Sequence, residues 1–189
     1  NTFFFSLAYE SNIDELTKHL AKFGFGRNVC IDCFLPDSGL LPNPRWKMNT
    51  HNFGWFKGDT VNLGVGQGYL SATPIQLAYY SALLANKGSI NKLSFVQGYS
   101  DPITDTIKTN NIYVSDWNKI HQSMIGVIEN PKGTAGRLRS LKDYTIAAKS
   151  GTVELVSTET KEDYKIIREN VGNRDHAIII AFGPMPNPK

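Results

Sequence analysis

The chain has 189 residues, of which 41% are apolar and 20% charged, so it is long and apolar enough to fold around one core. Its formal net charge is +3, with Lys and Arg scattered, which excludes the dense basic patch of a nucleic-acid-binding protein. No segment reaches the roughly 18 apolar residues that a membrane helix needs, and we predict no signal peptide within these residues. Because the first residue is Asn and the end is proline-rich, we expect a piece of a longer protein.

Two helices are predicted at the start of the chain. The first covers residues 2–9. Either Ser11 or Asn12 can cap the second, which runs from Ile13 to Phe23 with its apolar side chains on one stripe. Gly24 ends this helix, because glycine readily adopts the left-handed conformation that closes a helix.

The middle of the chain holds one strong helix signal. Residues 26–60 show few periodic signals and are predicted to be a long irregular segment. Residues 61–70 contain three glycines without the Gly-Lys-Ser/Thr of a phosphate loop, so we interpret them as sites of close backbone packing. Thr73, the proline after it and Gln76 form a predicted capping box that opens a buried helix ending at Gly88.

The second half of the chain is predicted to contain one helix and three strands. A strand near 93–99 comes first, followed by a surface loop over 100–111 and by a helix that is capped by Ser115 and Asp116 and runs to about Glu129. The last two strands cover 144–156 and 176–182. The last strand is apolar without alternation, so we expect burial on both faces or nearly so. Helices early and antiparallel strands late predict an α+β fold, with helices packed on an antiparallel sheet in one domain over residues 1–189.

The two cysteines form a CxxC pair, Cys30 and Cys33. Such a pair can be redox-active or supply half of a zinc site, which needs about two further ligands. The nearest histidines in sequence, His19 and His51, lack ligand spacing. We therefore interpret the pair as two ordinary thiols or a local disulfide.

The main chemical signal lies at Lys149, Ser150, Gly151 and Thr152. A lysine in a strand that looks buried is costly unless it has a partner or a task, and Gly151 lets a ligand approach closely. The hydroxyls of Ser150 and Thr152 lie two residues apart and share a strand face. This pattern predicts a cationic, hydroxyl-rich strand edge that holds an anion such as a carboxylate. The alternative is a lysine that extends its ammonium to water from a strand end.

Further stretches accompany this tetrad in a fixed order. They are Asn1 to Phe5, Gly58 to Thr60 followed by Gly66 to Tyr69, Ala72 to Ala78, Asn130 to Ala135, and Asp175 to Ala177. Together with the tetrad, which looks like the KTG box, they resemble the transpeptidase domain of class B penicillin-binding proteins over nearly the whole chain. The likeness to the elongation-type subfamily, penicillin-binding protein 2, rests on Arg45-Trp46-Lys47 and Gly66 to Tyr69.

The resemblance implies a fold like penicillin-binding proteins and serine β-lactamases, incomplete here, and a site built from three motifs. The first, Ser-x-x-Lys, carries the nucleophile and base and is expected before this chain begins. Asn1 would end the second motif, Ser-x-Asn, and Lys149 to Thr152 would form the third. The letters Ser-x-x-Lys also occur at Ser89 to Lys92, but they follow a helix end, whereas the nucleophile needs a helix start. We therefore reject Ser89 as the nucleophile.

The resemblance also implies a role for each site residue. The backbone N–H of Thr152 would supply half of the oxyanion hole, where one donor is worth roughly 2.7–4 kcal/mol of barrier. The hydroxyls of Ser150 and Thr152 would hold the substrate carboxylate, with Gly151 between them. Lys149 would add positive field and contact the serine of the second motif. Asn1 would orient the lysine or the substrate amide, or would only cap a helix. This chemistry needs no metal or organic cofactor.

Other candidates have weaker support. Asp175 and His176 could suggest a Ser-His-Asp triad, but no serine is tied to them, so a structural role at a strand start is favoured. Trp46, Trp55 and Phe56 would line a substrate cleft or simply pack.

The implied function is that of a peptidoglycan D,D-transpeptidase, a serine acyl-transferase that acts on D-Ala-D-Ala stem peptides and is a target of β-lactam antibiotics. A membrane anchor, a glycosyltransferase partner and a place at the periplasmic face of the bacterial inner membrane are expected for the full-length protein, with no nucleic acid bound. Two alternatives stay open: a β-lactamase or D,D-carboxypeptidase of the same fold, and a non-catalytic module that binds or senses β-lactams or peptides.

Overall fold

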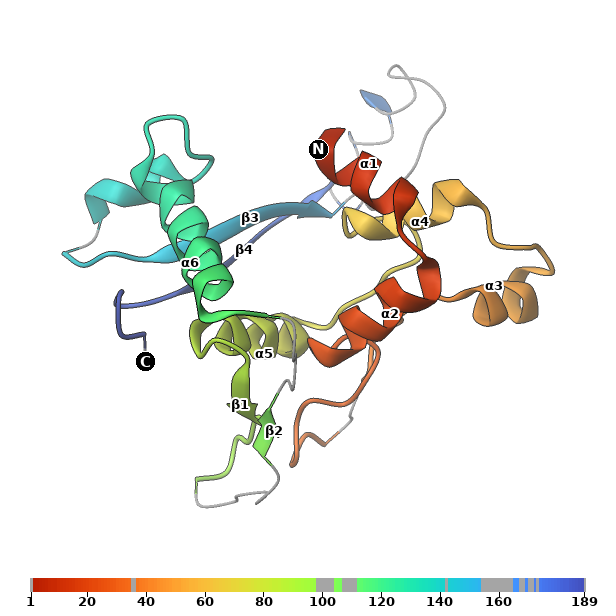
Figure 1. Cartoon of the computed structure of the whole chain (residues 1–189), viewed down its shortest axis with the longest axis horizontal. Coiled ribbons are helices and arrows are strands. Elements are labelled where there is room, and N and C mark those ends of the chain that lie inside the picture. The colour runs from red at the N-terminus through yellow and green to blue at the C-terminus, as the bar shows by residue number, and fades with distance from the viewer. Residues whose placement is uncertain are drawn as a thin grey trace. The chain divides into compact units, whose positions relative to one another are not determined.

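A computed structural model describes residues 2–34, 37–97, 104–106, 112–141, 143–153, 165–166, 169, 172 and 174–188. The chain divides into two compact units, Asn1–Ile112 and Tyr113–Lys189, and each is described by itself. The first unit contains helices α1 (Thr2–Glu10), α2 (Ile13–Lys22), α3 (Pro44–His51), α4 (Lys57–Gly64) and α5 (Pro74–Ala85), and strands β1 (Ser89–Asn91) and β2 (Thr104–Thr106) (Figure 1). The second contains α6 (Val114–Glu129), the 3-10 helix η1 (Gly136–Leu141), and strands β3 (Ala147–Val153) and β4 (His176–Phe182). Helices with antiparallel strand pairs make an α+β fold, as predicted.

The first two helices form as the sequence predicts. Asn12 caps α2, because its side-chain oxygen accepts hydrogen bonds from the backbone N–H groups of Asp14 at 2.8 Å and Glu15 at 3.3 Å. The backbone of Gly24 has φ +96°, in the left-handed region expected after a helix end. The helix itself ends at Lys22, one residue before the predicted boundary.

Two helices, α3 and α4, lie in the segment predicted to be irregular, so that prediction is wrong. The side chain of Asn43 caps α3 by accepting the N–H of Trp46 at 2.9 Å, with Pro44 at the first helical position. The carboxylate of Asp59 in the first turn of α4 accepts the N–H of Phe56 at 2.7 Å. Neither helix carries an apolar stripe, so periodicity gave no signal, although the Asn-Pro start is the same kind of cap as at α5.

Close packing explains one of the three glycines between residues 61 and 70. A Cβ atom added at Gly64 of α4 would lie 2.3 Å from the Cβ of Ala8 in α1, so these two helices meet where a side chain has no room. Gly66 and Gly68 have φ angles of +78° and +74°. Glycine is favoured there because it has no Cβ atom and adopts a positive φ without steric cost. The predicted close packing is therefore confirmed at Gly64 of α4.

The helix α5 is anchored by a buried glutamine. Thr73 and Gln76 form the predicted capping box, and the side chain of Gln76 is fully buried. Its amide nitrogen donates to the carbonyl oxygens of Gly24 at 3.0 Å, Arg27 at 3.1 Å and Ser38 at 2.8 Å. The same side chain therefore starts α5 and holds the segment that follows α2 against it.

The strand predicted near 93–99 is displaced along the chain. Instead, β1 (Ser89–Asn91) pairs antiparallel with β2 (Thr104–Thr106), which lies in the predicted surface loop. Leu93 forms a single bridge with Cys30, and Tyr99 lies outside the described residues. The short segment Ser-Ile-Asn pairs through its backbone and has too little apolar character to be recognised as a strand.

In the second unit, α6 packs on β3 (Figure 1). The buried side chains of α6 are Trp117, His121, Met124 and Ile128. The helix starts at Val114, before the predicted cap, with Tyr113 at the cap position and no side-chain cap bond. The predicted cap at Ser115 and Asp116 is therefore wrong.

The strand β4 has the predicted bounds but not the predicted burial. It pairs antiparallel with β3, from Ala147 opposite Phe182 to Val153 opposite His176. Phe182 is buried against His121 of α6, with ring centroids 5.3 Å apart. Ile179 is 48% exposed, so the strand is not buried on both faces within the part of the chain that the structure describes. The apolar composition of β4 shows that burial of its side chains is favourable. It does not show which segments of the protein pack on them.

Among the described residues, no helix is both long and apolar enough to cross a membrane.

Candidate active site

The tetrad Lys149 to Thr152 occupies the middle of β3. Its residues pair with Ile180, Ile179, Ile178 and Ala177 of β4, respectively. Within the described ranges β3 has β4 on one edge and no strand on the other. Ser150 is half-buried and the other three residues are exposed, so the tetrad lies on an open strand edge that solvent reaches. Alternation along β3 puts the Ser150 and Thr152 side chains on one face and the Lys149 side chain on the other.

Lys149 is not in the buried environment that its apolar neighbours suggest. Its side chain is exposed, and its ammonium donates a hydrogen bond to the backbone carbonyl of Ser150. No carboxylate that the structure describes lies within ion-pair distance of this ammonium. An exposed cation in this position can meet an anion that approaches the strand.

The hydroxyl of Ser150 has a partner that sequence reasoning missed. The Oγ of Ser150 lies 2.7 Å from the Oγ1 of Thr134, and either atom can donate the hydrogen bond. Thr134 belongs to the stretch Asn130 to Ala135, which was singled out as a matching motif without any role. The signal was therefore present in the sequence, but only the fold shows that the two motifs touch.

The loop that carries Thr134 is fixed to the end of α6. The N–H of Ala135 donates to the carbonyl of Val127 at 3.0 Å. The guanidinium of Arg139 donates to the carbonyl oxygens of Ile128 at 2.8 Å and Asn130 at 3.0 Å. These bonds satisfy carbonyl groups that a helix end otherwise leaves without partners, so the loop has a defined position.

The other residues considered for catalysis are Asn1, Ser89 and the pair Asp175 and His176. Asn1 lies outside the described residues, so its predicted role stays a prediction. Ser89 begins β1 just after Gly88 and is exposed, which agrees with its rejection as the nucleophile. His176 is the first residue of β4, the strand-start position expected for it, and Asp175 precedes it.

The aromatic candidates Trp46, Trp55 and Phe56 lie in the first unit around a buried ion pair. The ammonium of Lys47 in α3 lies 2.6 Å from the carboxylate of Asp59 in α4 and 4.7 Å from the centre of the Phe56 ring. Trp55 donates its indole N–H to the Thr60 hydroxyl at 2.9 Å. Trp46 packs edge-on against Tyr69, with ring centroids 5.3 Å apart. A hollow of about 230 Å³ beside them is lined by Pro42, Trp55, Asp59, Asn62, Leu63, Gly68 and Tyr69.

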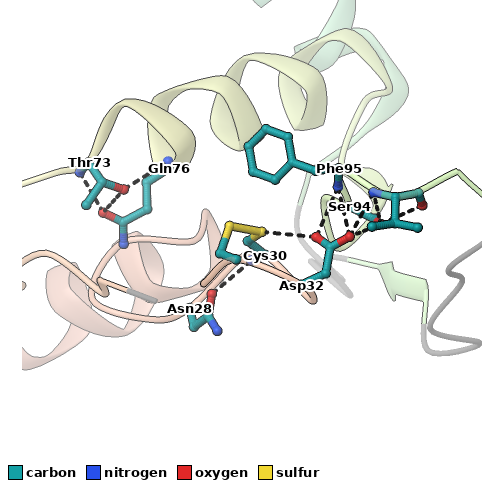
Figure 2. Close-up of a disulfide and its surroundings, with 9 residues drawn as sticks. Asn28, Cys30, Asp32, Thr73, Gln76, Ser94 and Phe95 are labelled. Atoms are coloured by element: carbon teal, nitrogen blue, oxygen red, sulfur yellow. Dashed lines mark hydrogen bonds between the residues drawn. A yellow bond between two sulfur atoms is a disulfide. The ribbon is translucent and has the colours of Figure 1, made fainter. Parts of the chain in front are cut away.

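The two cysteines form a local disulfide, one of the two interpretations left open by the sequence. Between them, the carboxylate of Asp32 accepts the N–H groups of Phe95 at 3.0 Å and Val96 at 2.8 Å and the hydroxyl of Ser94 at 2.7 Å (Figure 2). The Phe95 N–H, with the Ser94 hydroxyl next, holds the pKa of Asp32 below its ordinary value. Among the described residues, no group of three or more His, Cys, Asp and Glu side chains could hold a metal ion.

Comparison with known sequences identifies similar proteins over the whole chain. Residues 1–189 match the family model described as the penicillin binding protein transpeptidase domain. The chain is 33% identical over 202 residues to the peptidoglycan D,D-transpeptidase MrdA of Escherichia coli K12, covering all of this chain and 31% of that protein. The MrdA of Acinetobacter baumannii is 34% identical over 197 residues, covering all of this chain and 29% of that protein. The chain thus spans about a third of the length of these curated relatives.

Solved structures give the same result for the fold. A crystal structure of Pseudomonas aeruginosa PBP2 in complex with WCK 5153 has a TM-score of 0.81 and 35% sequence identity, with all of this chain and 40% of that chain covered. PBP2 of Helicobacter pylori, solved in complex with MreC, has a TM-score of 0.81 and 28% identity, with all of this chain and 32% of that chain covered.

Proposed function

Because the chain belongs to the family of penicillin-binding protein transpeptidase domains, we propose that it is the C-terminal part of such a domain in a peptidoglycan D,D-transpeptidase. The observation that carries the proposal is the exposed Lys-Ser-Gly-Thr tetrad on the open edge of β3. It offers two hydroxyls on one face of the strand, a cation on the other face, and backbone N–H groups along the edge between them. These groups suit the terminal carboxylate and the peptide carbonyl of a D-Ala-D-Ala stem peptide.

The reaction begins with a serine that precedes this chain. Its oxygen attacks the carbonyl carbon between the two D-Ala residues while a partner lysine takes the serine proton. The peptide C–N bond breaks, D-Ala leaves as an amine that gains a proton, and an ester to the enzyme remains. An amine of a second stem peptide then attacks the ester carbonyl, the C–O bond breaks, and the serine regains its proton. The product is a cross-link.

Three roles in this reaction are assigned to residues of β3. The backbone N–H of Thr152 donates to the oxyanion that forms in both attacks. The hydroxyls of Ser150 and Thr152 donate to the substrate carboxylate, and Gly151 keeps the strand surface low beside them. Lys149 supplies positive charge, and its reach to the serine of a Ser-x-Asn motif ending at Asn1 would assist proton transfer. No metal or organic cofactor takes part.

Partners and location follow from the same assignment. The full-length protein would bind peptidoglycan stem peptides and react with β-lactams. It would be held at the periplasmic face of the inner membrane by an N-terminal anchor and work with a glycosyltransferase. The MreC bound to the Helicobacter pylori relative indicates a class of protein partner to test.

Mass spectrometry of the full-length protein incubated with a penicillin tests this proposal. A covalent adduct that persists for hours supports a penicillin-binding protein. Rapid release of hydrolysed antibiotic supports a β-lactamase instead. With a D-Ala-D-Ala stem peptide in place of the penicillin, release of D-Ala without a cross-linked product supports a carboxypeptidase. Failure to form any adduct supports a non-catalytic binding module and contradicts the proposal.

A further inference from the structure

The hydrogen bond between Thr134 and Ser150 points to a residue that acts through another. We propose that Thr134 is a positioning residue, whose hydroxyl orients the Ser150 hydroxyl so that the Ser150 proton points to the substrate carboxylate. The inference rests on the proposed function and adds to it a residue outside the tetrad. Its basis is the 2.7 Å separation of the two oxygens and the rigid loop that holds Thr134.

The direction of this hydrogen bond decides what Ser150 offers to an anion. Two hydroxyls in contact share one proton between them, and each has a single proton to donate. When Ser150 donates to Thr134, a lone pair of Ser150 faces the incoming carboxylate and repels it. When Thr134 donates to Ser150, the Ser150 proton is free for the carboxylate, and the chain of two bonds polarises the second one. A bound carboxylate therefore favours the second arrangement, which needs the hydroxyl of Thr134.

Thr134 is suited to this role because its backbone has little freedom to move. A Cβ atom added at Gly133, the preceding residue, would lie 2.3 Å from the carbonyl oxygen of Val127 in α6. The N–H of Gly133 donates to Asn130 O at 2.8 Å, and that of Ala135 to Val127 O at 3.0 Å. Both neighbours of Thr134 are thus bound to the end of α6, and the helix itself packs on β3. The position of the hydroxyl is set by the same helix and strand that set Ser150.

The test compares Thr134→Val, which keeps the shape and removes the hydroxyl, with Thr134→Ser, which keeps the hydroxyl. In the full-length protein we expect Thr134→Val to slow acylation by a penicillin about three- to tenfold, the effect of one neutral hydrogen bond, and Thr134→Ser to stay within about twofold of wild type. A penicillin methyl ester, which lacks the carboxylate, should react with wild type and Thr134→Val at the same rate. Ser150→Ala should remove the effect, so that Thr134→Val in the Ser150→Ala background changes the rate less than about twofold.

Two results overturn the inference while leaving the proposed function intact. One is a Thr134→Val variant that is acylated as fast as wild type. The other is an equal loss with the acid and the ester, which is the result of a purely structural role. If Thr134→Val fails to fold by circular dichroism, Thr134→Ala is measured against Thr134→Ser with the same two compounds. An unreactive wild-type protein, in contrast, refutes the proposed function itself.

Discussion

Two lysines in this chain occupy opposite environments. Lys47 in α3 is 4% exposed, and its ammonium lies 2.6 Å from the carboxylate of Asp59. Lys149 in β3 is exposed, and its ammonium bonds only a backbone carbonyl among the contacts described for it. A buried cation needs an anion beside it, because an unpaired charge in the protein interior strongly lowers the free energy of unfolding. An exposed cation can receive an anion from outside. Under the proposed function, Lys47 is therefore a structural lysine and Lys149 a recognition lysine.

The largest effect is expected at the buried ion pair. Lys47→Met leaves the Asp59 carboxylate without its cation in a partly buried site, so the free energy of unfolding should fall by about 3–5 kcal/mol. Urea denaturation followed by circular dichroism measures this loss. A double variant, Lys47→Met with Asp59→Leu, should recover much of it, because no uncompensated charge remains. A loss below about 1 kcal/mol in the single variant would show that Lys47 is not structural.

The matched change in β3 should act on the reaction and leave the stability unchanged. Lys149→Met in the full-length protein should alter the free energy of unfolding by less than about 0.5 kcal/mol, as for most exposed side chains. Its acylation by a penicillin should slow about 10- to 100-fold, since a hydrogen bond to a charged group contributes about 1.5–3 kcal/mol. Stopped-flow or quenched mass spectrometry gives the rate. If Lys149→Met lowers the free energy of unfolding but leaves the acylation rate unchanged, Lys149 is a structural lysine and the contrast with Lys47 is wrong.

The loop that carries Thr134 allows a test with a matched control. Gly133→Ala should lower the free energy of unfolding by about 1–3 kcal/mol, because the added Cβ meets the carbonyl of Val127 at 2.3 Å. Gly126→Ala, inside α6, meets no atom within 4 Å and should raise it by about 0.5–1 kcal/mol. Thermal denaturation measures the change in stability of each variant relative to wild type. An equal change in both variants would contradict the close contact at Gly133.

The smallest effect is expected at Asp32, the carboxylate between the two cysteines, and it depends on pH. The pKa of Asp32 is lowered in the folded chain, chiefly by the N–H of Phe95 and then by the hydroxyl of Ser94. A lowered pKa contributes stability that is present above the unfolded value, about 3.9, and is lost as the pH falls through the folded value. Wild type should therefore melt above Asp32→Asn at pH 7, and the difference should shrink below about pH 4. A difference that stays constant down to pH 3 would contradict the assigned hydrogen bonds.

Local chemistry in the sequence predicts some elements closely. The capping box at Thr73 and Gln76 fixes the start of α5, and Asn12 fixes the start of α2, because each cap depends on residues within one turn. The sequence does not predict α3 and α4, because neither helix has an apolar stripe. Tertiary contacts stabilise them instead, among them the ion pair between Lys47 and Asp59.

Of the candidate site, the structure confirms that the tetrad lies on a strand, whereas the roles of its residues stay predictions. The tetrad could be found in the sequence because its four letters are adjacent in the chain. The exposure of Lys149 and of Ile179 could not be read from their apolar neighbours, because burial depends on which segments cover a strand. The contact between Thr134 and Ser150 joins residues 16 positions apart through the packing of α6 on β3, so only the fold brings it into view.

The central claim is that the open edge of β3 receives a peptide's terminal carboxylate. A crystal structure of the full-length protein acylated by a penicillin tests this most directly. The antibiotic's carboxylate is predicted to lie within about 3 Å of the hydroxyl oxygens of Ser150 and Thr152, with the ester carbonyl oxygen at the Thr152 N–H. A carboxylate bound elsewhere, with the tetrad contacting no part of the antibiotic, would contradict the assignment.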